Sequence, residues 1–293
     1  MHTFGVWMLV PIVFLLFACP AACAQETAPE TRLAIVQAGV QQSEDAPFVS
    51  ANYTFLPGDY LYFTFEIAGF TPESLNRDEV HKIALTYRVT PEDTNGVPLT
   101  EPAQDSIKTD LSAEDKNWTP KRRTSFLLPS YLAAGDFRVH VQISDLIAKT
   151  EVSKDFPFHV GGTHITPAPS LNVQHFEFLR RESDRDALEI PAYSPGDTVF
   201  ARFDMAAFKL AAGNTYSLEY GLSVIQPSGK PFLDAPHAAE LKASSFYPAQ
   251  FLPGVIHITT PANSAKGNYL LTLTVHDLIG NTQFEIKKSF SIE

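Results

Sequence analysis

PGDYLYFTFEIAGF, at residues 57–70, recurs later in the chain as PGDTVFARFDMAAF, at residues 195–208. In both copies apolar residues occupy alternate positions after the Asp, which predicts a strand with one buried face and one exposed face. The residues expected to face inward are Leu61, Phe63, Phe65 and Ile67 in the first copy and Val199, Ala201, Phe203 and Met205 in the second. Those expected to face solvent are Thr64 and Glu66, and Arg202 and Asp204.

Two further blocks recur in the same order. Leu85, Tyr87 and Val89, followed by Gly96-Val97-Pro98, correspond to Tyr220, Leu222 and Val224, followed by Gly229-Lys230-Pro231. The last block aligns Gly135, Phe137, Val139, Val141, Ile143 and Asp145 with Gly267, Tyr269, Leu271, Leu273, Val275 and Asp277. Three blocks in the same order indicate a duplicated structural unit.

Turn residues border these strands. Pro-Gly-Asp precedes the first strand of each copy, and it suits a turn because Pro fixes φ, Gly accepts positive φ, and Asp hydrogen-bonds nearby backbone. Asp145 and Asp277 stand where the strand of the last block should end in a hairpin. An Asx turn would explain both carboxylates.

The chain is predicted to be all-β. It contains 22 prolines and no long amphipathic pattern, so we expect antiparallel sandwiches with about seven or eight strands per copy. Residues 161–169 lack alternation and combine two glycines with two prolines, which is typical of a linker. The expected organisation is a first sandwich at residues 25–161, a linker at 162–169 and a second sandwich at 170–293.

These blocks resemble the immunoglobulin-like units of macroglobulins and of bacterial envelope proteins. The resemblance is carried by 193–203, 227–231 and 267–277, and in degenerate form by the first copy. It implies two tandem immunoglobulin-like β-sandwiches. A complete macroglobulin also needs a thioester built on Cys, and the predicted mature chain has none, so covalent protease trapping is not implied.

The N-terminus resembles a secretory signal peptide. An apolar run at residues 4–18 leads to Ala22-Cys23-Ala24, which predicts cleavage after Ala24 and a secreted or periplasmic protein. The alternative is a lipoprotein leader, since Leu16-Phe17-Ala18-Cys19 loosely matches a lipobox; Cys19 would then anchor the protein to a membrane. Cleavage after Ala24 removes both cysteines, and with them any disulfide or thiolate site.

Composition and motifs argue against several functions. The net charge of −11 disfavours nucleic acid as a partner, and the motifs of common hydrolases and nucleotide-binding proteins are absent. His159 and His164 could share a metal with a carboxylate, but surface positions explain them more simply. His276 precedes Asp277 on the outward phase of its strand, which does not favour a catalytic pair. We therefore expect no catalytic residue, no metal and no cofactor.

The binding residues predicted from the sequence are Trp118, Asn117 and Lys121. Trp118 is the only tryptophan beyond the leader, and it lies in a polar segment, where an aromatic ring can stack on a sugar or anchor a protein. The simpler alternative is that Trp118 covers the end of the core. The sequence thus favours an exported, non-enzymatic binding or structural module whose partner is an envelope or extracellular protein or glycan. The alternative is an exported hydrolase or its accessory domain.

Overall fold

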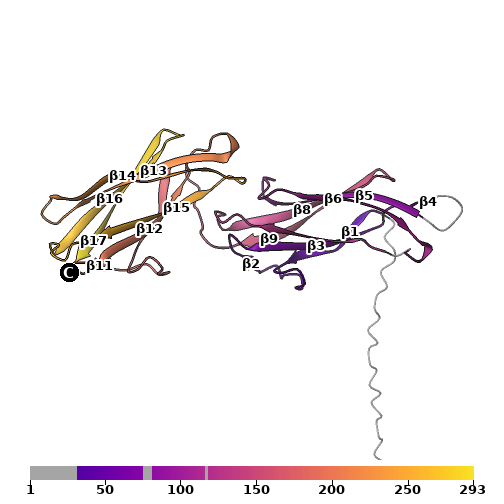
Figure 1. Ribbon diagram of the computed structural model, residues 1–293, viewed down its shortest axis with the longest axis horizontal. Coiled ribbons are helices and arrows are strands. Elements are labelled where there is room, and N and C mark those ends of the chain that lie inside the picture. The colour runs from indigo at the N-terminus through magenta and orange to yellow at the C-terminus, as the bar shows by residue number, and fades with distance from the viewer. Residues whose placement is uncertain (1–31, 75–80, 116–117) are drawn as a thin grey trace, which may run out of the picture.

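A computed structural model describes residues 32–74, 81–115 and 118–293 (Figure 1). Within these ranges the elements are strands, apart from two short 3₁₀ turns, η1 (Ala113–Asp115) and η2 (Ala212–Asn214). The first half contains β1 (Ala34–Gln41), β2 (Thr54–Phe55), β3 (Tyr60–Ala68), β4 (Glu73–Ser74), β5 (His81–Asp93), β6 (Ala103–Leu111), β7 (Lys121–Leu127), β8 (Gly135–Asp145) and β9 (Thr150–Val160). The second half contains β10 (Asn172–Leu179), β11 (Ala192–Tyr193), β12 (Thr198–Ala206), β13 (Thr215–Ile225), β14 (Pro231–Ser244), β15 (Phe251–Thr259), β16 (Gly267–Asp277) and β17 (Thr282–Ile292). The predicted leader and Cys19 lie outside the described residues.

Each half is a sandwich of two sheets with the same strand order. The sheet β1-β3-β7 of the first half corresponds to β10-β12-β15 of the second, and β2-β9-β8-β5 with β6 corresponds to β11-β17-β16-β13-β14. Pairing is antiparallel except for β2 with β9 and β11 with β17, which are parallel. The predicted all-β fold of two tandem immunoglobulin-like sandwiches is confirmed. Among the described residues the second half has eight strands, as predicted. The first half adds the short strand β4 and has nine, one more than the upper predicted number.

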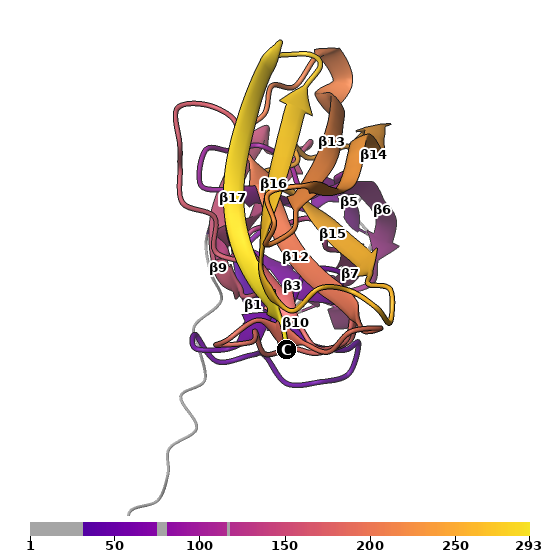
Figure 2. The same ribbon diagram turned by 90° about the vertical axis from the view of Figure 1, so that its left-hand side faces the viewer.

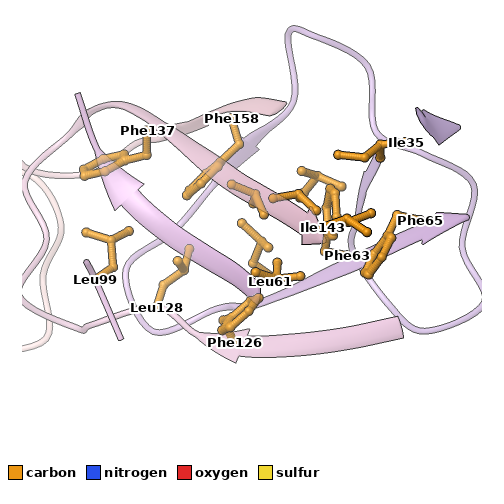
Figure 3. Packing of buried hydrophobic residues seen from close by; sticks show 14 of the residues in the cluster. Ile35, Leu61, Phe63, Phe65, Leu99, Phe126, Leu128, Phe137, Ile143 and Phe158 are labelled. Atoms are coloured by element: carbon orange, nitrogen blue, oxygen red, sulfur yellow. The ribbon is translucent and has the colours of Figure 1, made fainter. Parts of the chain in front are cut away.

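The first core forms where the sequence pattern places it (Figure 3). Leu61, Phe63, Phe65 and Ile67 of β3 are fully buried, and Phe137 of β8 stacks on Phe158 of β9 with ring centroids 5.7 Å apart. One expectation is corrected. Thr64 was expected to face solvent, yet it is buried and its hydroxyl donates a hydrogen bond of 2.6 Å to Gln41 Oε1.

The loop after β1 explains why Thr64 is buried. Gly39, the partner of Thr64 across the β1–β3 pair, lies directly beneath the ring of Phe48. The glycine has no Cβ, and a Cβ there would come within 2.6 Å of that ring. The segment that follows β1 therefore folds back over the outer face of the sheet and covers an outward position that the alternation alone assigns to solvent.

The second core repeats the arrangement of the first. The inward side chains of β12 are all buried, as are those of β16 from Tyr269 to Val275. Tyr269 stacks on Phe290 of β17 at 5.3 Å, and its hydroxyl donates a hydrogen bond of 2.8 Å to the carbonyl of Ala265. This ring is therefore part of the second core, and its hydroxyl is satisfied by nearby backbone.

The predicted turns are also present. Gly58 and Gly196 have φ of 87° and 95°, which a residue with a side chain adopts at a cost. Asp59 Oδ2 accepts a hydrogen bond from the N–H of Leu56, and Asp197 Oδ2 accepts the equivalent bond from Ser194, each at 2.8 Å. The aspartate of each Pro-Gly-Asp motif thus closes the turn that precedes its strand.

Both halves contain a buried aspartate at the end of the β8–β9 or β16–β17 hairpin. Asp145 Oδ1 accepts hydrogen bonds from the N–H groups of Ile147 and Ala148, and Asp277 Oδ1 accepts them from Ile279 and Gly280. The predicted Asx turns are confirmed. The second oxygen of each carboxylate does more, because it also bonds the backbone N–H of a distant residue, Thr71 or Lys209, at 2.7 Å.

Residues between the halves make more contacts than their glycines and prolines suggested. Ile165 packs against a small cluster formed by Ala133 of the first half with Ala206 and Phe251 of the second. The N–H of Ala134 donates a hydrogen bond of 2.7 Å to the carbonyl of Thr163. The halves lie end to end, so a view along the long axis shows the strands of the second half in front of those of the first (Figure 2).

Tyr247, which follows β14, joins the core cluster of the first half and is only 2% exposed. Its hydroxyl lies 3.2 Å from Asp93 Oδ2, at the end of β5, and receives a hydrogen bond from Gln250. Burial, together with the nearby Asp93 charge, raises the pKa of Tyr247. This side chain from the second half therefore belongs to the packing of the first.

Candidate functional site

The predicted Trp118 site is only partly visible. Trp118 is 37% exposed and lies outside the core clusters, and its backbone N–H bonds the carbonyl of Asp115 at 2.9 Å. Lys121 is exposed at the start of β7, opposite Glu66 of β3. Asn117 lies outside the described residues. Of the three predicted residues, Trp118 and Lys121 are therefore exposed on the surface. Their binding role stays a prediction.

The two histidines suggested as metal ligands share no contact in the structure. His159 Nδ1 lies 2.9 Å from Asp136 Oδ1, whereas His164 is exposed in the segment between the halves. Within the described residues, one group has three ligand atoms close enough to share a cation, namely Glu92, His140 and Asp155.

Arg138 already supplies a cation to that group. Its guanidinium lies 2.7 Å from Glu92 Oε1 and 3.5 Å from Asp155 Oδ2, while His140 Nδ1 lies 2.6 Å from Asp155 Oδ1. The hydrogen bond with Glu92 raises the pKa of Arg138. Since Glu92 is nearly buried, its carboxylate needs a partner, and the arginine satisfies that need without a metal.

His276 and Asp277 do not form a catalytic pair. The carboxylate of Asp277 is buried, and it accepts the three backbone hydrogen bonds described above. His276 lies on the outward face of β16, opposite Gln283. The aspartate therefore has a structural task, and its neighbour faces the other side of the sheet.

A polar hollow of about 500 Å³ lies on the outer face of the sheet β6-β5-β8. It is built from two rows of side chains that run across three paired strands. One row carries hydroxyls and the other carries amides and a guanidinium: Ser106, Thr86 and Ser144, and Gln104, Arg88 and Gln142. Arg88 Nη1 donates a hydrogen bond of 3.3 Å to Gln104 Oε1. Such a surface offers many hydrogen bonds and little apolar contact.

An aromatic hollow of about 330 Å³ lies at the start of β3. Its lining residues are Gln42, Tyr53, Phe55, Asp59, Tyr60 and Tyr62. Tyr60 and Tyr62 project from the same face of β3 with ring centroids 6.2 Å apart, and Tyr60 is 54% exposed. Phe55 is buried and meets Tyr53 edge to face at 4.8 Å. Three tyrosines, a carboxylate and an amide thus line one small concavity.

The second half shows which side chains occupy the corresponding positions of the repeat. The positive-φ bulge residues Gln37 and His175, and the turns at Asp59 and Asp197, fix the correspondence of the two halves. On this alignment the equivalents of Gln42, Tyr53, Phe55, Tyr60 and Tyr62 are Arg180, Pro191, Tyr193, Thr198 and Phe200. The fold therefore requires neither the tyrosine at position 53 nor the one at position 60.

Arg180 fills the equivalent place in the second half. Its guanidinium carbon lies 5.2 Å from the centroid of the Tyr193 ring, and Nη1 lies 3.8 Å from Asp197 Oδ2. Burial raises the pKa of Tyr193 to about 12, although the charge of Arg180 acts in the opposite direction. The Tyr193 hydroxyl donates a hydrogen bond of 2.8 Å to the carbonyl of Leu179.

The charged loop that begins at Arg180 is held by its own groups. Arg181 Nε lies 3.5 Å from Asp184 Oδ1, and the guanidinium of Arg202 donates to the carbonyls of Asp184 and Arg185. The positive and negative side chains of this loop therefore pair with each other, and Arg202 binds its backbone carbonyls. The loop has no surplus of one sign that would attract a charged partner.

Comparisons with known proteins give no family. The sequence matches no model of a protein family and no curated protein. Among solved structures it is similar to the C-terminal domain of the antigen I/II polypeptide BspA of Streptococcus agalactiae, with a TM-score of 0.29, 9% identity, and coverage of 87% of this chain and 99% of that chain. It is also similar to the C-terminal domain of the antigen I/II-family protein AspA of Streptococcus pyogenes, with a TM-score of 0.28, 10% identity, and coverage of 87% and 99%.

A TM-score of this size carries neither fold nor function from those proteins to this chain. The resemblance to macroglobulin units therefore stays an expectation from the sequence. Among the described residues, no helix has the length and apolar character needed to span a membrane.

Proposed function

We propose that the protein is an exported, non-enzymatic module that binds another protein through its first half. The observation that supports this most directly is the aromatic hollow at Tyr53, Tyr60 and Tyr62. Tyr60 is 54% exposed, Tyr53 and Tyr62 are partly exposed, and tyrosine is enriched in protein interfaces, where the ring is buried and the hydroxyl finds a partner. Because the second half has the same strand order without tyrosines at positions 191 and 198, the fold does not account for their presence.

Export is the part of this proposal that rests on the sequence. The run at residues 4–18 and the Ala22-Cys23-Ala24 pattern support a cleaved leader and a secreted or periplasmic protein. A lipid anchor at Cys19 is the alternative. Mass spectrometry of the protein from its host distinguishes the two, because a lipid-modified Cys19 at the mature N-terminus would replace soluble export with anchoring.

Cross-linking in the native host tests the binding role. Three forms of the full chain are compared: the unmodified protein, Tyr60→Ala with Tyr62→Ala, and Ile190→Ala. Ile190 is a suitable control because it is 74% exposed but lies in the second half. We expect the unmodified chain and Ile190→Ala to capture the same partner and the double variant to lose it. Equal capture by all three forms would remove the first half's hollow from the binding surface.

Glycan binding is a second candidate, favoured by the polar hollow of β6-β5-β8. Hydroxyl, amide and guanidinium groups are the groups that hydrogen-bond sugar hydroxyls, and they lie there in two adjacent rows. Arg88→Ala with Gln142→Ala removes the centre of the guanidinium and amide row. On a glycan array, a saccharide that binds the unmodified chain but not this variant would support the second candidate over the first.

The hydrolase alternative has its own test. A panel of hydrolase substrates is incubated with the purified mature chain, and each polar residue near a turned-over substrate is replaced singly. We expect no turnover. Activity that one such substitution abolishes would replace the binding role with an enzymatic one.

A further inference from the structure

We propose that the aromatic hollow of the first half binds the side chain of an arginine from a partner polypeptide. This inference rests on the proposed function and names the group that the site recognises. This arginine hollow is the concavity lined by Gln42, Tyr53, Phe55, Asp59, Tyr60 and Tyr62.

The second half provides the precedent within the same molecule. There a guanidinium, that of Arg180, already lies over an aromatic ring and beside the carboxylate of the Pro-Gly-Asp turn. The ring and the carboxylate belong to Tyr193 and Asp197, the equivalents of Phe55 and Asp59. A cation above the face of an aromatic ring is attracted by the ring quadrupole, and a nearby carboxylate adds to that attraction.

The first half keeps the carboxylate but has no built-in cation at the equivalent position, and because Phe55 is 1% exposed beside Tyr53, the ring surface open to a ligand is that of the tyrosines. Gln42 stands where the second half has Arg180, so the arginine hollow contains a neutral side chain at its rim. Asp59 retains its place, because its Oδ2 accepts the N–H of Leu56 as Asp197 Oδ2 accepts that of Ser194. In the second half the same oxygen also faces the guanidinium, so the turn hydrogen bond and the ion pair are compatible.

The added tyrosines enlarge the aromatic surface at this place. Tyr60 and Tyr62 present two rings inclined at 40° to each other, and Tyr53 stands against Phe55 on the other side. The second half has Thr198 and Pro191 at two of these positions. Where the second half needs one ring to hold its own arginine, the first half offers several rings to an arginine that must arrive from outside.

A guanidinium suits this site better than an ammonium. It is planar, stacks on aromatic faces and is more weakly hydrated, so less hydration is lost when it enters the hollow. The chain's net charge of −11 also favours a cationic partner segment at long range. The expected partner is therefore a polypeptide that presents an exposed arginine, and the tyrosine hydroxyls can bond the flanking backbone carbonyls.

Binding of small model compounds to the full mature chain tests the inference directly. The probes are N-acetylarginine amide, N-acetyllysine amide and N-acetylcitrulline amide, of which the last keeps the planar shape without the charge. Chemical shifts of the tyrosine rings in an NMR titration report occupancy of the hollow. We expect the arginine compound to bind at least about tenfold more tightly than the citrulline compound, as loss of a partly desolvated cation–π contact predicts.

Two substitutions locate the site without disturbing the fold. Gln42→Arg copies the second half and should fill the hollow with the chain's own guanidinium, which abolishes binding of the arginine compound. Tyr60→Thr, which also copies the second half, should weaken binding by about tenfold. Ile190→Ala serves as the control and should bind as the unmodified chain does. Equal binding of arginine and citrulline, or undiminished binding by Gln42→Arg, would overturn the inference.

The remaining outcomes separate this inference from the proposed function. Equal binding of the lysine and arginine compounds would overturn the preference for guanidinium. If no model compound binds while cross-linking still captures a partner that depends on Tyr60 and Tyr62, the arginine inference fails and the binding role stands. If the arginine compound binds but no partner is captured in the host, the site exists and the proposed protein-binding role fails.

Discussion

Asp277 Oδ2 accepts a hydrogen bond of 2.7 Å from the backbone N–H of Lys209, a residue 68 positions earlier in the chain. The first half repeats the relationship between Asp145 and Thr71. Each aspartate therefore joins a hairpin at one end of its sandwich to the segment that follows β3 or β12. A single carboxylate accepts hydrogen bonds from two N–H groups of its own hairpin turn. It accepts a third from the segment that follows a strand of the opposite sheet.

The first prediction concerns this carboxylate. Asp277→Ala should lower the free energy of unfolding by about 3 kcal/mol, because charge-assisted hydrogen bonds to buried backbone are lost and their donors are left unpaired. Chemical denaturation of the full chain, followed by circular dichroism, measures the change. Asp234→Ala, at an exposed position of β14, is the control and should stay within about 0.5 kcal/mol. Equal stability of the two variants would contradict the structural role.

The second prediction compares the rings that open β8 and β16. Tyr269→Phe should cost about 1 kcal/mol, since it removes only the hydrogen bond to the Ala265 carbonyl. Tyr269→Ala and Phe137→Ala should each cost about 3 to 5 kcal/mol, because both rings are buried and a cavity would remain. Denaturant unfolding of the three variants tests the order. A mild effect of both alanine substitutions would be inconsistent with buried rings.

The third prediction uses the pKa of Tyr193. Burial raises this pKa from 10.0 to about 12, so the folded chain favours the protonated ring. The stabilisation that this provides is fully present below pH 10 and is lost as the pH rises through about 12. Tyr193→Phe has no proton to lose and should show a shallower fall of unfolding free energy over this range. Parallel curves for the two proteins would refute the assignment.

The fourth prediction addresses the junction. Residues 25–161 and 168–293, expressed separately, should both fold, because each contains its own pair of sheets and its own core cluster. The first fragment should be less stable than in the full chain, since it loses the buried contact with Tyr247. Circular dichroism and thermal melts of the fragments measure this. Two unfolded fragments beside a folded full chain would show that the halves depend on each other.

The fifth prediction concerns metal ions at Glu92, His140 and Asp155. Zinc or calcium should leave the melting temperature of the unmodified chain unchanged, because the guanidinium of Arg138 already lies between the two carboxylates. Arg138→Met vacates that position and should make the melting temperature sensitive to metal. Stabilisation of the unmodified chain by either ion would show that the metal competes successfully with the arginine.

The sequence predicts the sheets well because alternation directly encodes which side chains face the core. Asp277 could be assigned the turn that ends its strand, and Tyr269 lies in a block that recurs in both halves. The case of Thr64 shows where this approach stops. Its outward phase was correct, but its burial depends on Phe48 folding back over Gly39, a contact that local periodicity does not describe.

The candidate site was harder to predict for a related physical reason. The sequence singled out Trp118 because it is rare, whereas the aromatic hollow depends on Gln42 and Tyr53 from a loop meeting Tyr60 from a strand. The one sequence pattern that could have found it is the difference between equivalent positions of the repeat, namely Gln42 against Arg180 and Tyr60 against Thr198. The Pro-Gly-Asp repeat already aligns Tyr60 with Thr198, but the sequence does not show that Gln42 and Tyr53 line the same hollow as Tyr60.

The matched bulges at Gln37 and His175 and the matched turns at Asp59 and Asp197 have a practical consequence for engineering. The loops between them, 42–53 and 180–191, have equal length and equivalent end points, so either can be transplanted into the other half without a change of register. A chimera with two copies of the 42–53 loop, and Tyr at position 198, would be bivalent. A chimera with two copies of the 180–191 loop would be an inert scaffold of the same shape.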